Sequence, residues 1–422
     1  MKTKILLILI CICGMHMTQA QEDREWGFLK TLQGISYMQK IWTQGIDTVY
    51  VIGGIGTGMI ARSTNQGESW EKQLLPIATL RDIIFTDHNT GYVVGDNGGI
   101  VKTSDGGTTW IPLDSGTDLP LNAIAATGPN NIWIVGGLYV KTSYYGIILH
   151  STDEGNTWQQ VDPFPENNKK YFEDIAFRNN LGFITGISTV YKTVDYGNTW
   201  EKLTVEENSY SPYRSINITE NKAYMLMSDC FFSTEDWNNW KIEKESGSYA
   251  ISDGLFFLDD NLGYHSYGLQ IDGAYSGDPV IMITPNGGKN WTEMKVDYNK
   301  MSHPHVGSYS SIRMVNDTLG YVVFNESILK MPKPSKSNNI KKVSTDNNLS
   351  IISPSGKLII QSPFSTIQSV DLLDVSGKVL ESKKINNNDL DAEINTSHIP
   401  HGMYIIRTSL EGNKTMFNKW IK

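Results

Sequence analysis

The sequence predicts an all-β protein: a seven-bladed β-propeller, its last blade closed by the N-terminal strand, followed by a small immunoglobulin-like β-sandwich. The first observation is a phrase, TSDGGTTW at 103–110, that occurs with variations six times. The second is that short apolar segments separated by turn residues precede the copies, as in LRDIIF, GYVVG and GIVKT between 80 and 103. A repeat of about forty residues with several short strands is typical of propeller blades. The third is a C-terminal β pattern that lacks the phrase.

The repeated phrase has the chemistry of a tight turn between two strands. An Asp or Asn oxygen can accept N–H bonds of its own turn, glycine supplies positive φ, and Ser or Thr hydroxyls tie the strand ends. The indole is expected to fill the space between blades. The copies are STNQGESW (63–70), TSDGGTTW (103–110), STDEGNTW (151–158), TVDYGNTW (193–200), STEDWNNW (233–240) and TPNGGKNW (284–291), with tryptophans 40, 48, 42, 40 and 51 residues apart. We interpret these as structural residues and not catalytic ones: Asp105, Trp110, Asp153, Trp158, Asp195 and Trp200.

The phrase resembles the Asp box, or bacterial neuraminidase repeat. Residues 99–110, GIVKTSDGGTTW, and the preceding GYVVG strand also resemble the propellers of photosystem II stability and assembly factors. Sialidases and xyloglucan hydrolases share the Asp box. In known families it lies at the blade periphery, so the resemblance implies an architecture and leaves the function to other residues. In 233–240, Glu235 replaces Asp and Trp237 replaces Gly, which predicts a reshaped turn.

The two ends of the repeat region complement each other. Residues 310–331 supply three strands of a last blade and stop without an Asp box. The segment EWGFLKTL at 25–32 resembles the fourth strands of other blades, such as WEKLTV at 200–205. We therefore expect residues 26–31 to pair with 327–331 and close the ring, which protects strand edges that an open propeller would expose.

The N-terminal segment indicates where the protein is sent in the cell, and the net charge of the chain limits the partners it can bind. Lys2 and Lys4 precede an apolar run at 5–13, and a small-residue site ends at Ala20, so residues 1–20 are interpreted as a secretory signal peptide. The chain carries a net charge of −9, of which residues 21–331 contribute −15, so nucleic acid is not an expected partner. Cys230 is the one cysteine left after cleavage and is expected to be buried in a strand.

The C-terminal region has its own organisation. Residues 332–346 are polar, basic and proline-containing, as in a linker, and 347–422 form a compact β pattern. The turn at 374–377, the phrase IPHGMY at 399–404 and the basic end resemble the type A C-terminal sorting domain of the type IX secretion system of Bacteroidetes. The usual YPNP opening is replaced by ISPSG at 352–356. The resemblance implies export by the type IX machinery to the cell surface or the medium.

Candidate ligand-binding residues occur at the start of the first strand of each blade. The second position is polar while the rest of the strand is apolar, and its residues are Arg81, Asn122, Glu173, Arg214 and Asp253. Insertions at 137–146 and 267–279 are expected on the same face. Tyr145, Tyr275 and Tyr213 would suit stacking on sugar rings or peptide. The alternatives are that the polar residues are ordinary strand ends and that the tyrosines pack the loops.

These patterns favour a secreted binding or scaffold propeller for a glycan or protein ligand, more than an enzyme. The alternative is a glycoside hydrolase for a neutral polysaccharide, which requires two carboxylates across a cleft. A sialidase is disfavoured because an acidic propeller repels an anionic sugar. No cofactor or metal is expected. His303 and His305 are read as parts of a solvated loop, and GGIGTG at 53–58 has no helix to form a phosphate site.

Overall fold

The computed structural model divides into two compact units, Met1–Pro334 and Ser335–Lys422. It describes residues 25–35, 37–140, 143–163, 171–205, 213–227, 230–245, 254–271, 274–297, 310–324, 326–331, 350–352, 357–361, 367–374, 378–385, 391–396, 398–399, 403–410 and 414–421. The predicted signal peptide (1–20) and linker (332–346) lie outside these residues. Within them, no helix is long and apolar enough to span a membrane.

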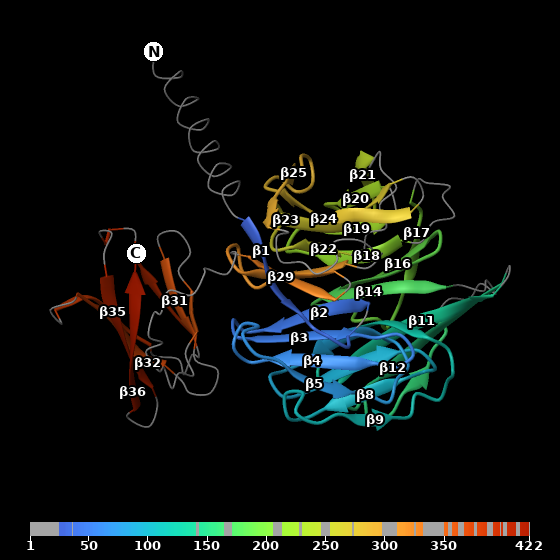
Figure 1. The fold of residues 1–422 in the computed structure, drawn as a ribbon, viewed down its shortest axis with the longest axis horizontal. Coiled ribbons are helices and arrows are strands. Elements are labelled where there is room, and N and C mark those ends of the chain that lie inside the picture. Colours follow the sequence, from blue (N-terminus) through green and yellow to red (C-terminus); the bar gives the residue numbers. More distant parts are fainter. Residues whose placement is uncertain are drawn as a thin grey trace, which may run out of the picture. The chain divides into compact units, whose positions relative to one another are not determined.

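Every element that the structure describes is a β-strand, and the first unit is a β-propeller built from small, mostly antiparallel sheets (Figure 1). Six sheets contain four strands each in chain order: β2 (Met38–Gln44), β3 (Thr48–Gly53), β4 (Met59–Ser63), β5 (Glu71–Leu74); β6 (Leu80–Phe85), β7 (Gly91–Gly95), β8 (Ile100–Thr103), β9 (Ile111–Leu113); β10 (Leu121–Gly128), β11 (Asn131–Val140), β12 (Ser143–Ser151), β13 (Gln159–Gln160); β14 (Phe172–Arg178), β15 (Leu181–Gly186), β16 (Thr189–Thr193), β17 (Glu201–Leu203); β18 (Tyr213–Ile218), β19 (Ala223–Met227), β20 (Cys230–Thr234), β21 (Lys241–Glu245); β22 (Gly254–Phe257), β23 (Gly263–Ile271), β24 (Ala274–Thr284), β25 (Thr292–Glu293).

A further sheet joins the two ends of the propeller sequence. Its order is β26 (Lys295–Asp297), β1 (Glu25–Thr31), β29 (Ser327–Met331), β28 (Gly320–Phe324) and β27 (Ser310–Met314). Strand β1 pairs antiparallel with β29, with Gly27 opposite Lys330, and parallel with β26, with Trp26 opposite Val296. The Trp26 side chain is 0% exposed and its indole N–H donates to Met294 Sδ at 3.2 Å. The N-terminal strand is therefore held on both edges.

The repeated phrase forms the hydrogen-bonded turn that its residues predict. Asp105 Oδ1 accepts from the Thr103 hydroxyl and from the Thr109 N–H, both at 2.8 Å, and Oδ2 accepts from the Thr109 hydroxyl at 2.7 Å. These bonds, led by the Thr109 N–H, lower the pKa of Asp105 to about 2. The copies at 151–158 and 193–200 repeat the pattern around Asp153 and Asp195. Both oxygens of each of these carboxylates thus accept hydrogen bonds from their own turn.

The turns are also fastened to the preceding sheet. The Tyr50 hydroxyl donates to the Gly106 carbonyl at 2.8 Å, and the Tyr92 hydroxyl donates to the Glu154 carbonyl at 2.6 Å. Trp110 packs edge-on against Phe85 at a centroid distance of 6.1 Å, in a core cluster shared by the sheets of β2 and β6. The half-buried tryptophans Trp158 and Trp200 pack on the next clusters around the propeller.

The divergent copy at 233–240 differs from the expected alignment. Asp236, and not Glu235, caps this turn: its Oδ1 accepts from the Asn238 N–H at 3.0 Å and from the Asn239 N–H at 2.8 Å. Trp237 has a φ of +65°, the left-handed conformation that glycine adopts in other copies. One residue fewer separates Thr234 from Trp240 than separates the equivalent pair in the other copies. The capping carboxylate still lies two residues after the Thr, so it is one position closer to the tryptophan.

The second unit contains two sheets that share one core. One has the order β30 (Ser350–Ile352), β31 (Lys357–Gln361), β34 (Asp391–Asn395), and the other has β33 (Val379–Lys384), β32 (Ile367–Leu373), β35 (Met403–Leu410), β36 (Lys414–Ile421). Leu358, Val370, Ile394 and Ile406 from both sheets belong to one buried cluster. Arg407 forms an ion pair with Asp371: its Nε lies 2.8 Å and a terminal nitrogen lies 2.7 Å from Asp371 Oδ2.

Candidate ligand site at the mouth of the central channel

The first strand of each propeller sheet, here called the inner strand, carries an irregularity at its second residue in five sheets. In β6, Leu80 pairs with Gly95 and Asp82 with Val94, so Arg81 has no partner residue in the ladder. The same shift occurs in β2, β10, β14 and β18. Such a bulge places an extra residue on the strand and redirects its side chain. The bulge residues are Gln39, Arg81, Asn122, Glu173 and Arg214.

All five bulge residues line one cavity of ≈ 280 Å³, called here the mouth cavity, together with Lys40, Ala123, Tyr171 and Asp174. Arg81 Nε donates to Asp96 Oδ1 at 2.6 Å, and Asn122 Nδ2 donates to the Phe172 carbonyl at 2.7 Å. Burial raises the pKa of Tyr171 to about 12, so its phenol stays protonated at neutral pH. The cavity therefore offers charged groups of both signs and a phenol, and Asp253, the remaining predicted member, lies outside the described residues.

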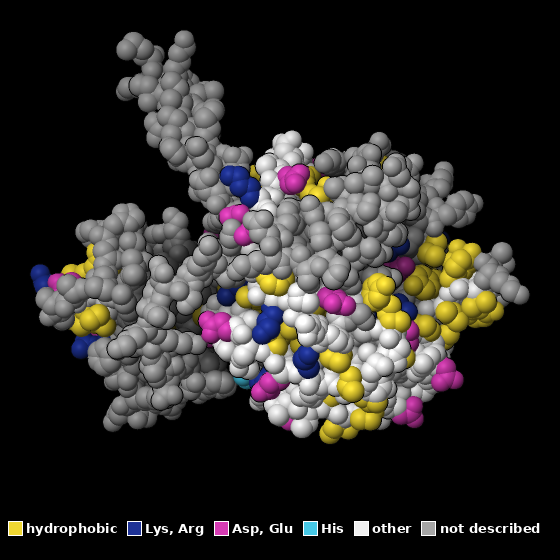
Figure 2. All heavy atoms as spheres, viewed as in Figure 1, with side chains coloured by type: hydrophobic (Ala, Val, Ile, Leu, Met, Phe, Trp, Pro, Cys, Tyr) yellow, Lys and Arg dark blue, Asp and Glu magenta, His cyan; other side chains and the backbone are white. Residues whose placement is uncertain are grey.

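A long hairpin extends beside this cavity. Gly136 of β11 lies opposite Leu121 at the start of β10, so residues 137–140 and 143–146 project past the same end of the inner strand. The Tyr139 and Tyr144 rings stack at 4.7 Å. Figure 2 shows hydrophobic side chains gathered at this end of β11. The exposed apolar residues of the hairpin are Leu138 (40%), Tyr139 (53%), Val140 (43%) and Tyr145 (46%).

Two of the predicted stacking tyrosines differ from Tyr145. Tyr213 is only 2% exposed and packs on Phe232 at 5.9 Å, so the prediction that its ring stacks on a ligand is wrong. It is the first residue of an inner strand, where Leu80 and Phe172 are also buried in the core. Tyr275 pairs with Gln270 in the second long hairpin, β23–β24, and its side chain lies outside the described residues.

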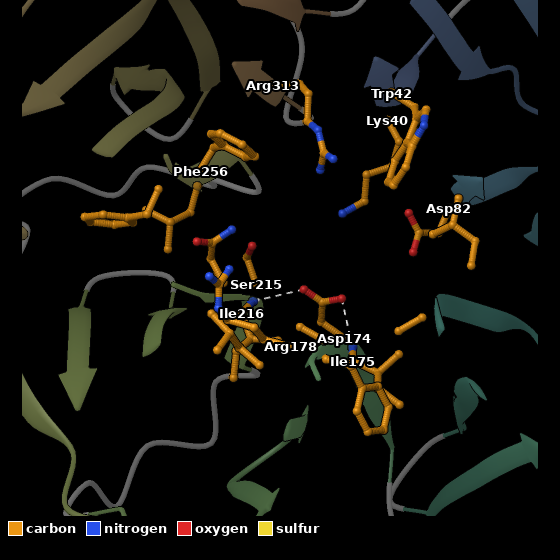
Figure 3. Close-up of a pocket in the computed structure, with 18 of the residues that line it drawn as sticks. Lys40, Trp42, Asp82, Asp174, Ile175, Arg178, Ser215, Ile216, Phe256 and Arg313 are labelled. Carbon is orange, nitrogen blue, oxygen red and sulfur yellow. Dashed lines mark hydrogen bonds between the residues drawn. The ribbon is translucent and has the colours of Figure 1, made fainter. Parts of the chain in front are cut away.

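Sequence reasoning missed four charged side chains of the inner strands, of which Lys40 and Asp174 also line the mouth cavity. Lys40, Asp82, Asp174 and Arg313 come from β2, β6, β14 and β27 and point into one cavity of ≈ 550 Å³, the channel cavity (Figure 3). Burial raises the pKa of Asp82, and it raises the pKa of Asp174 to about 6, while Lys40 counteracts both shifts. The sequence signal of Lys40, Asp82 and Asp174 is a charged residue at the third position of the inner strand, next to the polar second position, as in LRDIIF and FEDIAF; Arg313 is the fourth residue of β27.

The carboxylates of Asp82 and Asp174 accept hydrogen bonds from backbone N–H groups. Asp82 accepts from the N–H groups of Ile83 at 2.9 Å and of Ile124, on the next inner strand, at 3.0 Å. Asp174 accepts from Ile175 and from Ile216, again on the next inner strand, both at 2.9 Å. Each carboxylate thus ties two sheets together. In the described residues no group of three or more His, Cys, Asp or Glu could hold a metal, and His303 and His305 lie outside them.

Known protein families match both parts of the chain. Residues 63–166 match the family model of the photosynthesis system II assembly factor YCF48, and residues 354–422 match that of the secretion system C-terminal sorting domain. The propeller resembles photosystem II assembly factors. Both resemblances stated from the sequence are thereby confirmed, although each match covers only part of the chain.

The relatives differ in what their names say they do. The photosystem II assembly lipoprotein Ycf48 of Synechococcus sp. (strain CC9902) is 28% identical over 234 residues, which cover 51% of this chain and 66% of that protein. A xyloglucanase of Paenibacillus sp. is 23% identical over 248 residues, covering 47% of this chain and 24% of the enzyme. Among solved structures, the WD40 repeats of RRP9 superpose with a TM-score of 0.53 at 8% identity, covering 72% of this chain and 96% of that one. That likeness shows the propeller fold alone.

Proposed function

We propose that the propeller is a binding or scaffold module that holds a glycan or protein ligand at the mouth cavity and the adjoining β11–β12 hairpin. The observation that carries the proposal is the convergence of five polar bulge residues, from five separate inner strands, on one cavity beside an exposed apolar hairpin. Exposed apolar patches rimmed by polar groups mark interaction sites in soluble proteins. Bulges that redirect a side chain are also common beside functional sites.

The proposed architecture that supports this site is a closed ring of seven blades, with residues 21–331 as the propeller and β1 completing the last blade. Pairing of β1 with β29 favours closure. Each inner strand contacts the next, from β2 through β6, β10, β14, β18 and β22 to β27, and β27 contacts β2. The Ser311 hydroxyl of β27 accepts from the Ile41 N–H of β2 at 3.3 Å, in the way that Asp82 and Asp174 join other neighbours.

Hydrolysis of a neutral polysaccharide is the second candidate. The raised pKa of Asp174, about 6, is a property that suits a general acid, and the likeness to a xyloglucanase points the same way. Against it, both oxygens of Asp82 and of Asp174 already accept backbone N–H bonds between sheets. Incubation of the purified protein with xyloglucan, followed by reducing-end analysis, separates the candidates: turnover that disappears in Asp174→Asn would favour the hydrolase.

The binding proposal predicts a large loss of affinity when the hairpin surface becomes charged. We expect Leu138→Asp combined with Tyr139→Asp to weaken retention of the ligand at least tenfold, because both side chains are about half exposed and their removal should leave the fold intact. The measurement is binding to a glycan array and to cell-envelope fractions. The matched control is Ile111→Asp, which changes an even more exposed apolar residue (63%) on the outer strand β9. Equal binding by the hairpin variant and the wild type would remove the hairpin from the site.

We further propose that residues 347–422 are a type IX sorting domain that directs the protein to the cell surface or the medium, and that 332–346 is the linker. The match of 354–422 to a secretion system sorting domain supports this. The basis for independence is that the second unit has its own buried core.

Deletion of 347–422 is expected to leave the melting temperature of the propeller unchanged within about 2 °C and to retain the protein in the periplasm. Cell fractionation and a thermal melt of the truncated protein measure both effects. Normal amounts of truncated protein outside the cell would contradict the sorting role.

A further inference from the structure

Arg313 lies in the wall of the channel cavity between two aromatic rings. Its guanidinium carbon is 4.3 Å from the centroid of Trp42 and 5.2 Å from that of Phe256, within the range of cation–π contacts. Burial lowers the pKa of Arg313 to about 10, so it remains charged at neutral pH. In Figure 3 its guanidinium points into the open space that Lys40, Asp82 and Asp174 also face.

The hydrogen-bonding capacity of this guanidinium is unused within the part of the chain that the structure describes. No described residue accepts a hydrogen bond from it or forms an ion pair with it, and Asp82 acts on it only through longer-range attraction. Arginine presents five donors in a planar fork that matches a carboxylate. Arg313 is only partly buried, so its unused donors face the cavity and are accessible to an acceptor that enters it.

The other charges in the cavity are already compensated. The oxygens of Asp82 and Asp174 each accept a backbone N–H, and the Lys40 ammonium stabilises the charged form of both. Lys40 and Arg313 together balance the two carboxyl groups, so an incoming anion meets no excess of negative charge at this depth. The exposed lining residues Arg178, Glu220 and Asp259 add one positive and two negative charges at a different part of the wall.

We infer that the channel cavity is a second ligand site, adjoining the mouth cavity with which it shares Lys40 and Asp174, in which Arg313 binds the carboxylate of a small organic acid with Trp42 and Phe256 holding the guanidinium in place. The volume of ≈ 550 Å³ lies in the range of about 300–1,000 Å³ that small-molecule sites occupy. A small acid is favoured over a polypeptide because the guanidinium lies inside a channel lined on all sides by inner strands. This site does not depend on the binding proposed for the hairpin.

The test uses acetate as the minimal probe and citrate as a larger one. The thermal melt of the purified protein is followed while chloride is replaced by either anion at constant ionic strength, with acetamide as the neutral isostere of acetate. We expect a saturable rise in melting temperature with acetate and citrate and none with acetamide, since a ligand that binds only the folded state stabilises it. Arg313→Gln should weaken binding at least tenfold, whereas Lys202→Gln, which removes one positive charge from the exposed outer strand β17 outside both cavities, should retain it.

Two further measurements keep the test decisive. If Arg313→Gln does not fold, Arg313→Lys keeps the charge without the planar fork and should still lose most of the affinity. Saturation-transfer NMR on the wild type with acetate, competed by citrate, detects binding without any variant. An equal rise in melting temperature for wild type and Arg313→Gln would identify a general salt effect and overturn the site, as would absence of saturation transfer.

Discussion

A protein that begins at Gln33 is expected to lose the cooperative unfolding transition of the propeller and to aggregate. This truncation removes β1, which pairs with β29 on one edge and β26 on the other, so two unpaired edges are exposed at once. It also removes Trp26, whose side chain is 0% exposed in a core with Met294, Met314 and Leu329. Circular dichroism melts and size-exclusion chromatography measure the outcome.

A point substitution separates the packing from the strand pairing. Trp26→Ala keeps the backbone of β1 but leaves a large cavity, which costs about 3–5 kcal/mol for a buried aromatic. The control is a protein that begins at Glu25, which retains all of β1 and should melt like the wild type. Adding a peptide of residues 25–32 to the truncated protein should restore part of its stability. A monomeric, fully stable protein beginning at Gln33 would contradict the role of β1.

The strands of the propeller were predictable because their determinants are local. Turn residues, alternating apolar residues and the Asp-box phrase recur in the six four-stranded propeller sheets, so one copy explains the others. The turn around Asp105 followed from the residue types alone, since Asp, Gly and Thr have few other ways to satisfy that geometry. By contrast, β26 has only three residues, Lys295–Asp297, and no pattern marks it.

The candidate site was predictable only in part, because its residues are defined by pairing between strands. The second position of the inner strand was visible as polar, but the bulge that turns Arg81 and Glu173 to the mouth cavity appears only in the register. Asp82 and Asp174 were overlooked because one of the two N–H groups that each carboxylate accepts from belongs to the next sheet, and the sequence does not show which strands become neighbours. Tyr213 was predicted to stack on a ligand although the equivalent positions, such as Leu80, are apolar and buried.

The propeller is expected to be more stable at pH 5 than at pH 8, because of Asp174. Its pKa is raised by burial from 3.8 to about 6, so the folded state binds its proton more tightly than the unfolded state. The resulting stabilisation is complete below about pH 4 and is lost as the pH rises through 6. This shift of two pKa units changes the free energy of unfolding by about 3 kcal/mol at most. The pKa of Asp82 is also raised, which acts in the same direction.

Other groups titrate outside this pH range or change the stability in the opposite direction. Comparison of a variant with the wild type separates their effects from that of Asp174. The pKa of Asp105 is lowered to about 2, so its contribution is lost only under more acidic conditions. His150, whose pKa is lowered by burial, acts in the opposite direction, because its contribution is lost as the pH falls. The relevant quantity is therefore the difference in unfolding free energy between wild type and variant at each pH from 4.5 to 8.

Asp174→Asn should remove most of the pH dependence while lowering stability at pH 5. The neutral amide does not titrate, and its NH₂ group cannot accept one of the two N–H bonds that tie Ile175 and Ile216. Asp105→Asn is the matched control: Asn65 and Asn286 already occupy that position in other copies of the phrase, so its pH profile should follow the wild type. Urea unfolding at each pH gives the free energies. A wild-type profile that is flat between pH 4.5 and 8, or an unchanged slope in Asp174→Asn, would show that the Asp174 carboxyl is ionised in the channel at neutral pH without penalty.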